Sequence, residues 1–364
     1  HLNNKKKKFD IKKYKKFLQE IGYLVKEGNN FKIKTSNLDE EISKIAGPQL
    51  VVPITNARYV LNAANARYQS LYDSLYGTDV IQSLDSVSER YDPERGAEVI
   101  KFTKNFLDLR FPLVNGSWKS INKIYIKNNE LKLVNYKKET TLKNFEKFIG
   151  FRGNKEKPEA IILKNNNLHV EIIINPYAFS ARSDPAGISD IIVESAITTI
   201  CDHEDSVACV DAQDKIEGYR NWLGLMKGDL KTKFEKKGKF YIRKLNPDRK
   251  YISKDGVIKK LKGRALLLNR NNGHLMTNPS VLLKDGSEIP EGILDAFITS
   301  LCSLHDIESN KNSKQGSIMI VKPKQHGPDE CSFTDLLFGK VEELLKLKKN
   351  TIKCGIMDEE RRTS

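Results

Sequence analysis

The chain has 364 residues, of which 39% are hydrophobic and 30% are charged, and its formal net charge is +15. This composition is typical of a globular protein and excludes intrinsic disorder. The longest apolar runs are far shorter than the roughly 18 residues that a membrane-spanning helix needs. The N-terminal sequence HLNNKKKKFD has neither an initiator Met nor the apolar segment of a signal peptide. We therefore expect a cytoplasmic protein without membrane association, whose given sequence starts inside a longer one.

The spacing of the cysteines and the types of basic residue narrow the functional class of the protein further. The five cysteines are scattered and form no CxxC, which favours free thiols over a disulfide framework or a zinc site. Of the 62 basic residues 14 are Arg, which leaves 48 Lys, and many of these stand beside Asn in runs such as NNKKKK and KNNNLH. Proteins that read nucleic acids usually rely on Arg forks. We therefore interpret the lysines as a solvated surface, and a basic nucleic-acid-binding module remains the weaker alternative.

The first predicted elements are mostly helical. Apolar residues recur at helical spacing over 9–21, and Gly22 ends this basic amphipathic helix. A short strand at 50–54 precedes a helical pattern over 58–77. Asp92 and Pro93 then occupy the N-cap and first positions of another helix.

A β-rich block follows, in two pieces. Residues 121–174 alternate between apolar and polar and are broken by Asn-rich turns, which predicts hairpins. Residues 238–264 show a similar pattern, so the block covers about 110–176 and 238–264. We expect it to be inserted into another domain.

Outside this block, short apolar strands alternate with helices, as in βα units that build a parallel sheet. We predict helices over 184–197, 293–307 and 333–347, and strands at 198–201, 266–268, 318–321 and 352–357. Each strand ends in polar side chains, which is the habit of the functional face of a TIM barrel. The predicted fold is therefore α/β: a partial TIM (β/α)8 barrel of five strands, with an N-terminal helical segment and an inserted β-rich α/β domain.

The polar residues after two of these strands are candidates for catalysis. Asp202 and Glu204 follow a buried strand with period two, so they point to one side and could orient an Arg, support a metal or act as bases. The alternative is an acidic turn in which Asp205 or Ser206 caps the next helix. Arg270 could hold a carboxylate or stabilise a developing enolate, and an ion pair with Asp202 or Glu204 is compatible with that role.

The last strand leads into DEERR. Carboxylates without His or Cys partners favour Mg²⁺ over zinc, so Glu359 is a candidate metal ligand. A salt-bridged helix start explains the same residues. Lys322 and Lys324 are possible phosphate or carboxylate contacts or simply part of a loop. No GxGxxG, Walker A or GxSxG motif supports a nucleotide cofactor or a serine hydrolase.

Six stretches occur in order along the whole chain: AGPQLVVPITNARYVLNAANARYQSLYDSLYGTD, CDHEDSVACVDAQDKIEGYRNWLGLMKGDL, RKLNPDR, RNNGHLMTN, IVKPKQHGP and GIMDEERRTS. Together they closely resemble the malate synthase G family. The resemblance implies a monomeric TIM-barrel enzyme with an N-terminal helical clasp and an inserted α/β domain. Such an enzyme is an acyltransferase of the glyoxylate cycle that condenses acetyl-CoA with glyoxylate to give malate and CoA, using Mg²⁺.

The resemblance also implies roles for single residues. Arg270 stabilises the enolate and contacts glyoxylate, Glu359 binds Mg²⁺ and glyoxylate, and Asp202 and Glu204 support them. The residues that match acetyl-CoA contacts are Val51, Arg58, Tyr59, Ser206 and Arg243. The second metal ligand and the catalytic base of the family lie beyond position 364. We therefore expect roughly half of an enzyme, inactive alone.

The expected boundaries are 1–48 for the clasp segment and linker and 49–67 for the first barrel strand and the start of its helix. Residues 68–196 and 228–264 form the inserted domain, and 197–227 and 265–364 complete the truncated barrel. The alternative function is that of a related Mg²⁺-dependent barrel lyase or aldolase of the citrate-lyase type, which would share the strand-end acids and the Arg.

Overall fold

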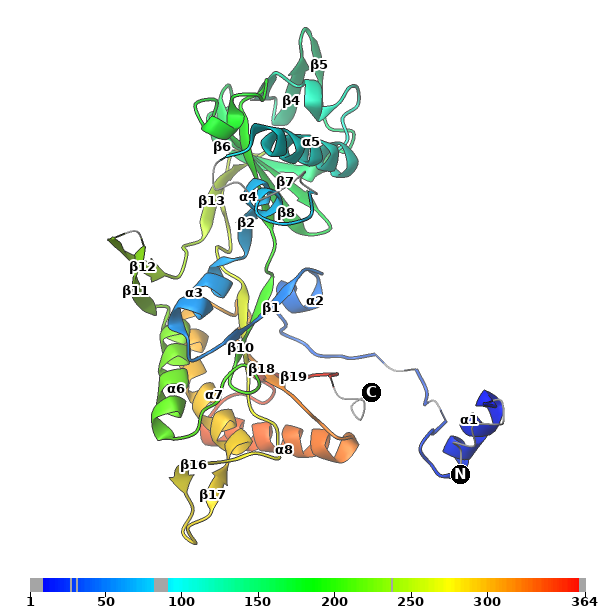
Figure 1. Cartoon of the computed structure of the whole chain (residues 1–364), viewed down its shortest axis with the longest axis vertical. Helices are drawn as coiled ribbons and strands as arrows, with labels where there is room; N and C mark the ends of the chain where they lie inside the picture. Colours follow the sequence, from blue (N-terminus) through cyan, green and yellow to red (C-terminus); the bar gives the residue numbers. More distant parts are fainter. Residues whose placement is uncertain (1–8, 27, 31, 82–90, 237, 360–364) are drawn as a thin grey trace. The chain divides into compact units, whose positions relative to one another are not determined.

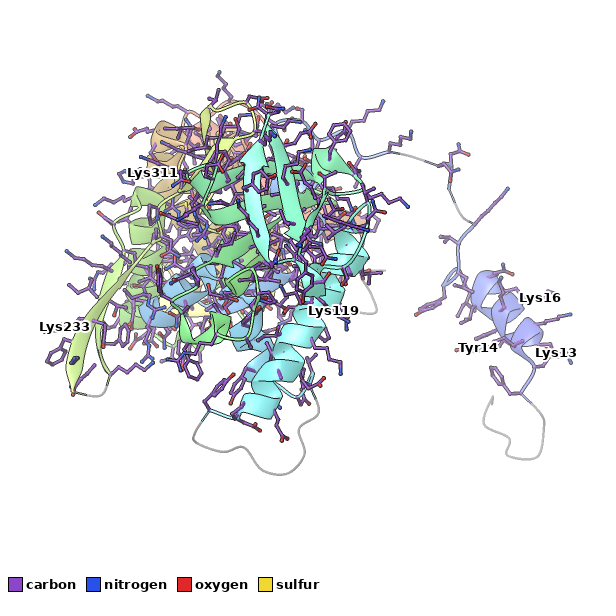
Figure 2. All side chains as sticks on the ribbon, turned by 90° about the horizontal axis from the view of Figure 1, so that it is seen from above. Lys13, Tyr14, Lys16, Lys119, Lys233 and Lys311 are labelled. Atoms are coloured by element: carbon purple, nitrogen blue, oxygen red, sulfur yellow. The ribbon has the colours of Figure 1, made fainter. Side chains whose placement is uncertain are left out.

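The structure is a computed structural model that describes residues 9–26, 28–30, 32–81, 91–236 and 238–359, and it divides into two compact units, 1–36 and 37–364. In the first unit, helix α1 (Ile11–Glu20) begins after Asp10, whose carboxylate accepts hydrogen bonds from the backbone N–H of Lys12 and Lys13 at 3.0 and 3.2 Å (Figure 1). The predicted helix is thus confirmed. None of its residues is buried, and its labelled side chains project from the ribbon in Figure 2.

A five-stranded parallel sheet forms the barrel part of the second unit. Its strands lie side by side in chain order: β1 (Gln49–Pro53), β10 (Thr198–Asp202), β15 (Leu266–Arg270), β18 (Ile318–Lys322) and β19 (Ile352–Ile356). The helices that follow the first four strands are α3 (Ala57–Asn65), α6 (Ala212–Lys227), α7 (Glu291–Ser309) and α8 (Pro328–Leu344). Residues of α3, α6 and α7 pack in one apolar cluster with β1, β10 and β15, and residues of α7 and α8 pack in a second cluster with β18 and β19. The four helices therefore lie on one face of the sheet, as right-handed connections between parallel strands require. This is the arrangement of a (β/α) barrel, so the predicted partial TIM barrel is confirmed.

Alternate residues of the barrel strands face opposite sides. Cys201 and Leu267 pack outward into one apolar cluster with Trp222 of α6. Ile200 and Leu268 belong to a different cluster, which lies on the inner face together with residues of β15 and β18. Because side chains alternate along a strand, Asp202 and Arg270 share the inner face with Ile200 and Leu268. The pleat therefore directs both charged residues toward the barrel interior.

The inserted domain has its own sheets and core. Its seven-stranded antiparallel sheet has the order β14 (Ile258–Leu261), β13 (Arg249–Ser253), β6 (Phe148–Gly153), β7 (Pro158–Asn165), β8 (Leu168–Ile174), β9 (Ile188–Glu194) and β2 (Tyr68–Ser70). Helices α4 (Leu71–Tyr76) and α5 (Pro93–Arg110) and a three-stranded sheet of β3 (Lys123–Lys127), β4 (Glu130–Asn135) and β5 (Lys138–Thr140) contribute to the same domain. Asp92 caps α5 and Pro93 opens it, as predicted.

The Asn-rich turns are hairpin turns. Asn128 and Asn129 join β3 to β4, Asn166 and Asn167 join β7 to β8, and all four have φ between 49° and 63°. Two consecutive residues with positive φ make the type I′ turn that suits the twist of a hairpin, and Asn tolerates this conformation well. The Asn residues in these Lys/Asn-rich runs therefore form the hairpin turns. Lysines elsewhere on the surface, such as Lys119 and Lys233, are exposed (Figure 2).

Smaller elements complete the second unit. They are helix α2 (Glu40–Ser43), the 3₁₀ turns Trp118–Ser120, Phe145–Lys147 and Phe179–Ala181, and the two-stranded sheets of β11 (Lys231–Lys236) with β12 (Lys239–Lys244) and β16 (Thr277–Leu282) with β17 (Glu288–Pro290). The pair β11–β12 packs against α3. Among the helices that the structure describes, none combines the length and apolar character that crossing a bilayer would require.

Two predictions about secondary structure were wrong. The segment 184–197, expected to be a helix, contains strand β9, in which four of the seven residues are Ile or Val. The Asp184 carboxylate accepts hydrogen bonds from the backbone N–H of Ala186 and Ile188 and so closes a turn before the strand. The pattern over 58–77 is not one helix, because β2 separates α3 from α4 and pairs with β9. In both cases pairing within the seven-stranded sheet, where β9 lies between β8 and β2, overrides a local helical pattern.

A buried ionic cluster stands where the chain passes between the barrel and the inserted domain. The Arg67 guanidinium lies 2.6 Å from a Glu41 oxygen and 2.7 Å from a Glu194 oxygen, and it donates to the carbonyl of Arg264 at 3.0 Å. The Arg67, Glu41 and Glu194 side chains are at most 5% exposed. Removing one member of such a cluster would leave an uncompensated buried charge.

Candidate active site

The site is built around an ion pair between two neighbouring barrel strands. Asp202 and Arg270 are register partners at the carboxyl ends of β10 and β15. Arg270 donates from Nε to Oδ1 of Asp202 at 2.7 Å and from Nη2 to Oδ2 at 2.6 Å. Such a two-pronged pair fixes the plane of the guanidinium as well as its position. The structure therefore brings these two predicted residues together.

The Asp202 carboxylate is fully engaged. Besides Arg270, it accepts hydrogen bonds from the backbone N–H of Glu204 at 2.8 Å, from the backbone N–H of Ser206 at 2.9 Å and from Ser206 Oγ at 2.5 Å. Burial disfavours the charged form of Asp202, but the hydrogen bonds from Arg270, Ser206 and the backbone outweigh it and lower its pKa from 3.8 to about 2. An acid with this low pKa orients its partner and is a poor proton acceptor at neutral pH.

One nitrogen of Arg270 is left for other partners. Its Nη1 lies 3.4 Å from Met357 Sδ and 3.5 Å from Glu359 Oε2. The Glu359 side chain is 27% exposed, whereas that of Arg270 is 7% exposed. The arrangement thus presents a fixed cation and a partly exposed carboxylate side by side, just beyond the carboxyl ends of the strands.

Glu204 connects the loops that follow three strands. Its Oε2 accepts a hydrogen bond from the Gly273 backbone N–H at 3.0 Å, and its carboxylate also forms an ion pair with Lys324. Burial raises the pKa of Glu204, although Lys324 opposes the shift. Helix α6 has Asp211 as its N-cap, so the alternative in which Asp205 or Ser206 caps that helix is wrong.

The structure adds supporting residues that sequence reasoning missed or treated only in passing. Asn272 donates from its side chain to the His203 carbonyl at 2.9 Å and from its backbone N–H to Asp295 Oδ2 at 2.9 Å. The fully buried Lys322 donates to the Asn272 carbonyl at 2.5 Å, and burial lowers its pKa from 10.5 to about 8. The signal in the sequence was weak, because the partners of Asn272 come from three separate segments: His203, Asp295 and Lys322.

The residues that match acetyl-CoA contacts fall into separate places. Arg58, in the first turn of α3, and Arg243, on β12, both place their guanidinium over the Phe234 ring, at 4.7 and 5.3 Å from its centroid. Tyr59 follows Arg58 in α3, and Val51 lies on β1; each is about half exposed. Ser206 instead donates to Asp202 beside Arg270, and no hydrogen bond among the described residues joins it to Arg58, Arg243 or Phe234.

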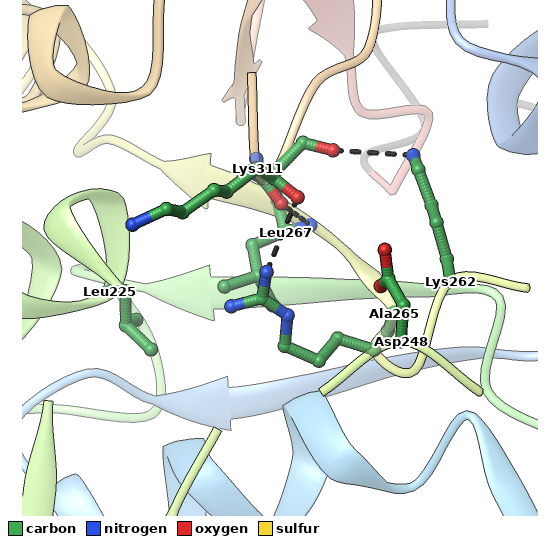
Figure 3. A pocket seen from close by; sticks show the side chains of 8 residues that line it. Leu225, Asp248, Lys262, Ala265, Leu267 and Lys311 are labelled. Atoms are coloured by element: carbon green, nitrogen blue, oxygen red, sulfur yellow. Dashed lines mark hydrogen bonds between the residues drawn. The ribbon is translucent and has the colours of Figure 1, made fainter. Parts of the chain in front are cut away.

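The opposite end of the strands has a different character. Near the amino ends, Leu267 exchanges two backbone hydrogen bonds with the Asn312 side chain, at 2.9 and 3.0 Å, and Lys262 donates to the Asn312 carbonyl (Figure 3). The cavity there has room for at most about one water molecule. In a TIM barrel the active site lies at the carboxyl ends of the strands, which here is the end that carries Arg270.

Known families match two segments of the chain. A family described as "Malate synthase G, alpha-beta insertion domain" matches residues 91–165, and one described as "Malate synthase, TIM barrel domain" matches residues 266–364. The first segment runs from α5 to β7 of the inserted domain, and the second contains the barrel strands β15, β18 and β19 with helices α7 and α8.

Curated relatives match the whole chain. Malate synthase G of Corynebacterium glutamicum is 51% identical over 369 residues, which cover 100% of this chain and 50% of the relative. Malate synthase G of Halalkalibacterium halodurans is 49% identical over 361 residues, covering 98% of this chain and 50% of the relative. The chain therefore spans about half the length of the curated relatives it matches. With this identity along its whole length, and with the barrel and insertion described above, the chain belongs to the malate synthase G family.

Proposed function

We propose that this chain supplies part of the active site of a malate synthase, which condenses acetyl-CoA with glyoxylate and hydrolyses the product to malate and CoA. The observation that carries the proposal is the Arg270 guanidinium, clamped by Asp202 at the carboxyl ends of two parallel strands with Nη1 left free of that clamp. Family membership and the position at the functional face of a barrel support it.

The chemistry needs a cation that is fixed before the reaction starts. Removing a proton from the methyl group of a thioester leaves negative charge on the thioester oxygen. A guanidinium already held by Asp202 would stabilise this charge without reorganising, which is the main source of catalysis by fixed dipoles and cations. In this proposal Nη1 of Arg270 faces the substrate oxygens, and Asp202 and Glu204 are positioning residues.

The proposed metal is Mg²⁺, with Glu359 as its ligand from this chain. Mg²⁺ favours oxygen ligands and binds one or two protein carboxylates together with substrate oxygens. The partly exposed carboxylate of Glu359 beside Arg270 is a ligand of this type. Within residues 9–359 as described, no three His, Cys, Asp or Glu side chains converge as a metal site. Glu359 is therefore at most one part of the site. When bound, the metal would polarise the aldehyde of glyoxylate.

Acetyl-CoA is proposed to lie along Val51, Arg58, Tyr59, Ser206 and Arg243. The two arginines that share the Phe234 ring are the strongest support for binding an anionic, phosphate-bearing substrate. We also propose a monomeric, cytoplasmic enzyme that binds no nucleic acid.

A thiol-release assay tests the proposal. The acids nearest to Arg270 are engaged, Asp202 by five donors and Glu204 by Lys324 and Gly273, so the described residues offer no free base beside Nη1 other than Glu359. We expect the 364-residue chain to release no CoA in a glyoxylate-dependent way with acetyl-CoA and Mg²⁺. A protein that carries the sequence of the relatives' remaining half in addition should be active. Activity of the 364-residue chain above a heat-treated control would contradict our assignment of roles. Inactivity of the longer protein would contradict the proposed function itself.

A further inference from the structure

The inserted domain contains a cavity of about 430 Å³, none of whose lining residues belongs to the five barrel strands. It lies between the second half of α5, the β7–β8 hairpin and β9. Its apolar wall consists of Leu71, Phe102, Phe106, Phe111, Leu168, Val170 and Val193. Cavities of a few hundred Å³ with apolar walls and a few polar groups are the usual sites of small ligands.

The polar residues of the cavity leave one cation without a partner. Arg110, the last residue of α5, lines the cavity and is exposed. Within the described part of the chain, its guanidinium has no carboxylate or hydrogen-bond acceptor; only its backbone carbonyl is used, by Lys147. The side-chain amides of Asn165 and Asn166 line the same cavity.

The only carboxylate among the lining residues is already neutralised. Glu194 accepts from Arg67 Nε at 2.7 Å through Oε1, and from His169 N and Nδ1 at 2.9 and 2.7 Å through Oε2. Since His169 uses Nδ1 for Glu194, the ring nitrogen that remains for another partner is Nε2. The cavity therefore offers a free guanidinium, an imidazole and two amides, but no unpaired negative charge.

We propose that this cavity binds a small organic carboxylate with an aromatic or branched aliphatic body. The carboxylate would accept the paired N–H groups of the Arg110 fork, and the body would pack between Phe102, Phe106 and Leu168. The apolar wall alone would accept neutral molecules equally well; the unpaired cation selects the anion. The proposal is independent of the barrel chemistry, because it uses none of the residues beside Arg270.

The test uses two fluorinated probes that differ only in charge, 4-fluorophenylacetate and 4-fluorophenylacetamide. Binding of each to the whole chain is measured by ¹⁹F NMR titration. We expect a dissociation constant of about 1 mM for the acid and about tenfold weaker binding of the amide. The variants are Arg110→Gln, which removes the cation at an exposed position, and Leu168→Trp, which fills the cavity. Arg182→Gln, an exposed arginine of the same domain outside the cavity lining, is the matched control.

The outcomes are distinct. Arg110→Gln should weaken binding of the acid about tenfold and leave the amide unchanged, Leu168→Trp should weaken both, and Arg182→Gln should change neither. Equal affinity of the two probes for the unaltered chain would overturn the proposed selection of anions. If the acid binds Arg110→Gln as tightly as it binds the unaltered chain, the cavity is not the site. Because Arg110 is exposed, its replacement tests the proposal even if Leu168→Trp fails to fold.

Discussion

Replacing Asp202 by Asn changes the shape of the side chain very little but removes its charge, so it isolates the contribution of the ion pair with Arg270. The amide keeps one acceptor and gains an NH₂ group. In one orientation the NH₂ faces Arg270 Nε and the Glu204 backbone N–H, which now donate at 2.7 and 2.8 Å. In the other it faces Arg270 Nη2 and both donors of Ser206. Either way, donor meets donor at Arg270.

The cost follows from the burial of the partner. The Arg270 side chain is 7% exposed, and Glu359, with an oxygen 3.5 Å away, is the only other acid within ion-pair distance among the described residues. Breaking a buried pair by removing one charge costs about 3–5 kcal/mol. We therefore expect Asp202→Asn to reduce the free energy of unfolding by about 3 kcal/mol, at the lower end because Glu359 still compensates part of the charge.

Urea unfolding at pH 7 measures the total effect, and hydrogen exchange locates it. Peptides covering 198–206 and 266–273 should lose protection, while those covering 158–174 in the inserted domain serve as an internal reference. Asp205→Asn is the matched control: it removes an acid three residues away whose side chain is 54% exposed and pairs with Lys324. It should cost less than about 1 kcal/mol. If Asp202→Asn changes stability no more than this control does, the pair makes no net contribution and our reasoning is refuted.

The remaining predictions use the same measurements or a kinetic assay. The lowered pKa of Asp202 means that its ionised carboxylate adds about 2 kcal/mol to the free energy of unfolding above pH 3.8, and that this is lost as the pH falls toward about 2. In urea titrations, the stability difference between the unaltered chain and Asp202→Asn should therefore shrink over this pH window. A constant difference would contradict the lowered pKa. In helix α7, Gly292→Ala should destabilise the protein by about 2 kcal/mol, because a Cβ there would lie 2.7 Å from Lys322 Nζ and 2.8 Å from the Asn272 carbonyl oxygen. In helix α8, a Cβ at Gly339 would meet nothing within 4 Å, so Gly339→Ala should stabilise the protein by about 0.5–1 kcal/mol. If thermal unfolding shows that Gly292→Ala and Gly339→Ala change the stability in the same direction, the packing argument is refuted. In the longer, active protein, Arg270→Lys should lower kcat about 10²–10³-fold without unfolding the barrel, because Lys keeps the charge but loses the fork; near-normal turnover would remove Arg270 from the mechanism.

The elements whose signals are local could be predicted from the amino-acid sequence alone. Five short apolar strands, each followed by polar residues, predicted a partial barrel. Both the apolar stretch and the polar residues at its end can be recognised from neighbouring residues in the sequence. The Asn pairs at 128–129 and 166–167 predicted hairpins because a type I′ turn requires positive φ at two adjacent positions, a conformation that Asn tolerates well. The choice of Asp202 and Arg270 as candidates needed only their place after such strands.

Which side chains contact one another, and in which protonation state, depends on the folded chain. The alternation of side chains and the register between β10 and β15 place Asp202 against Arg270, and a shift of one residue would send either to the outer face. The segment 188–194 became a strand because β8 and β2 flank it, which its own residues cannot specify. The supporting group of Asn272 joins four separate segments, so no spacing in the sequence could reveal it. Patterns of neighbouring residues in the sequence indicate the local preference for helix, strand or turn. Strand pairing, burial and pKa depend on residues that come close only when the chain folds.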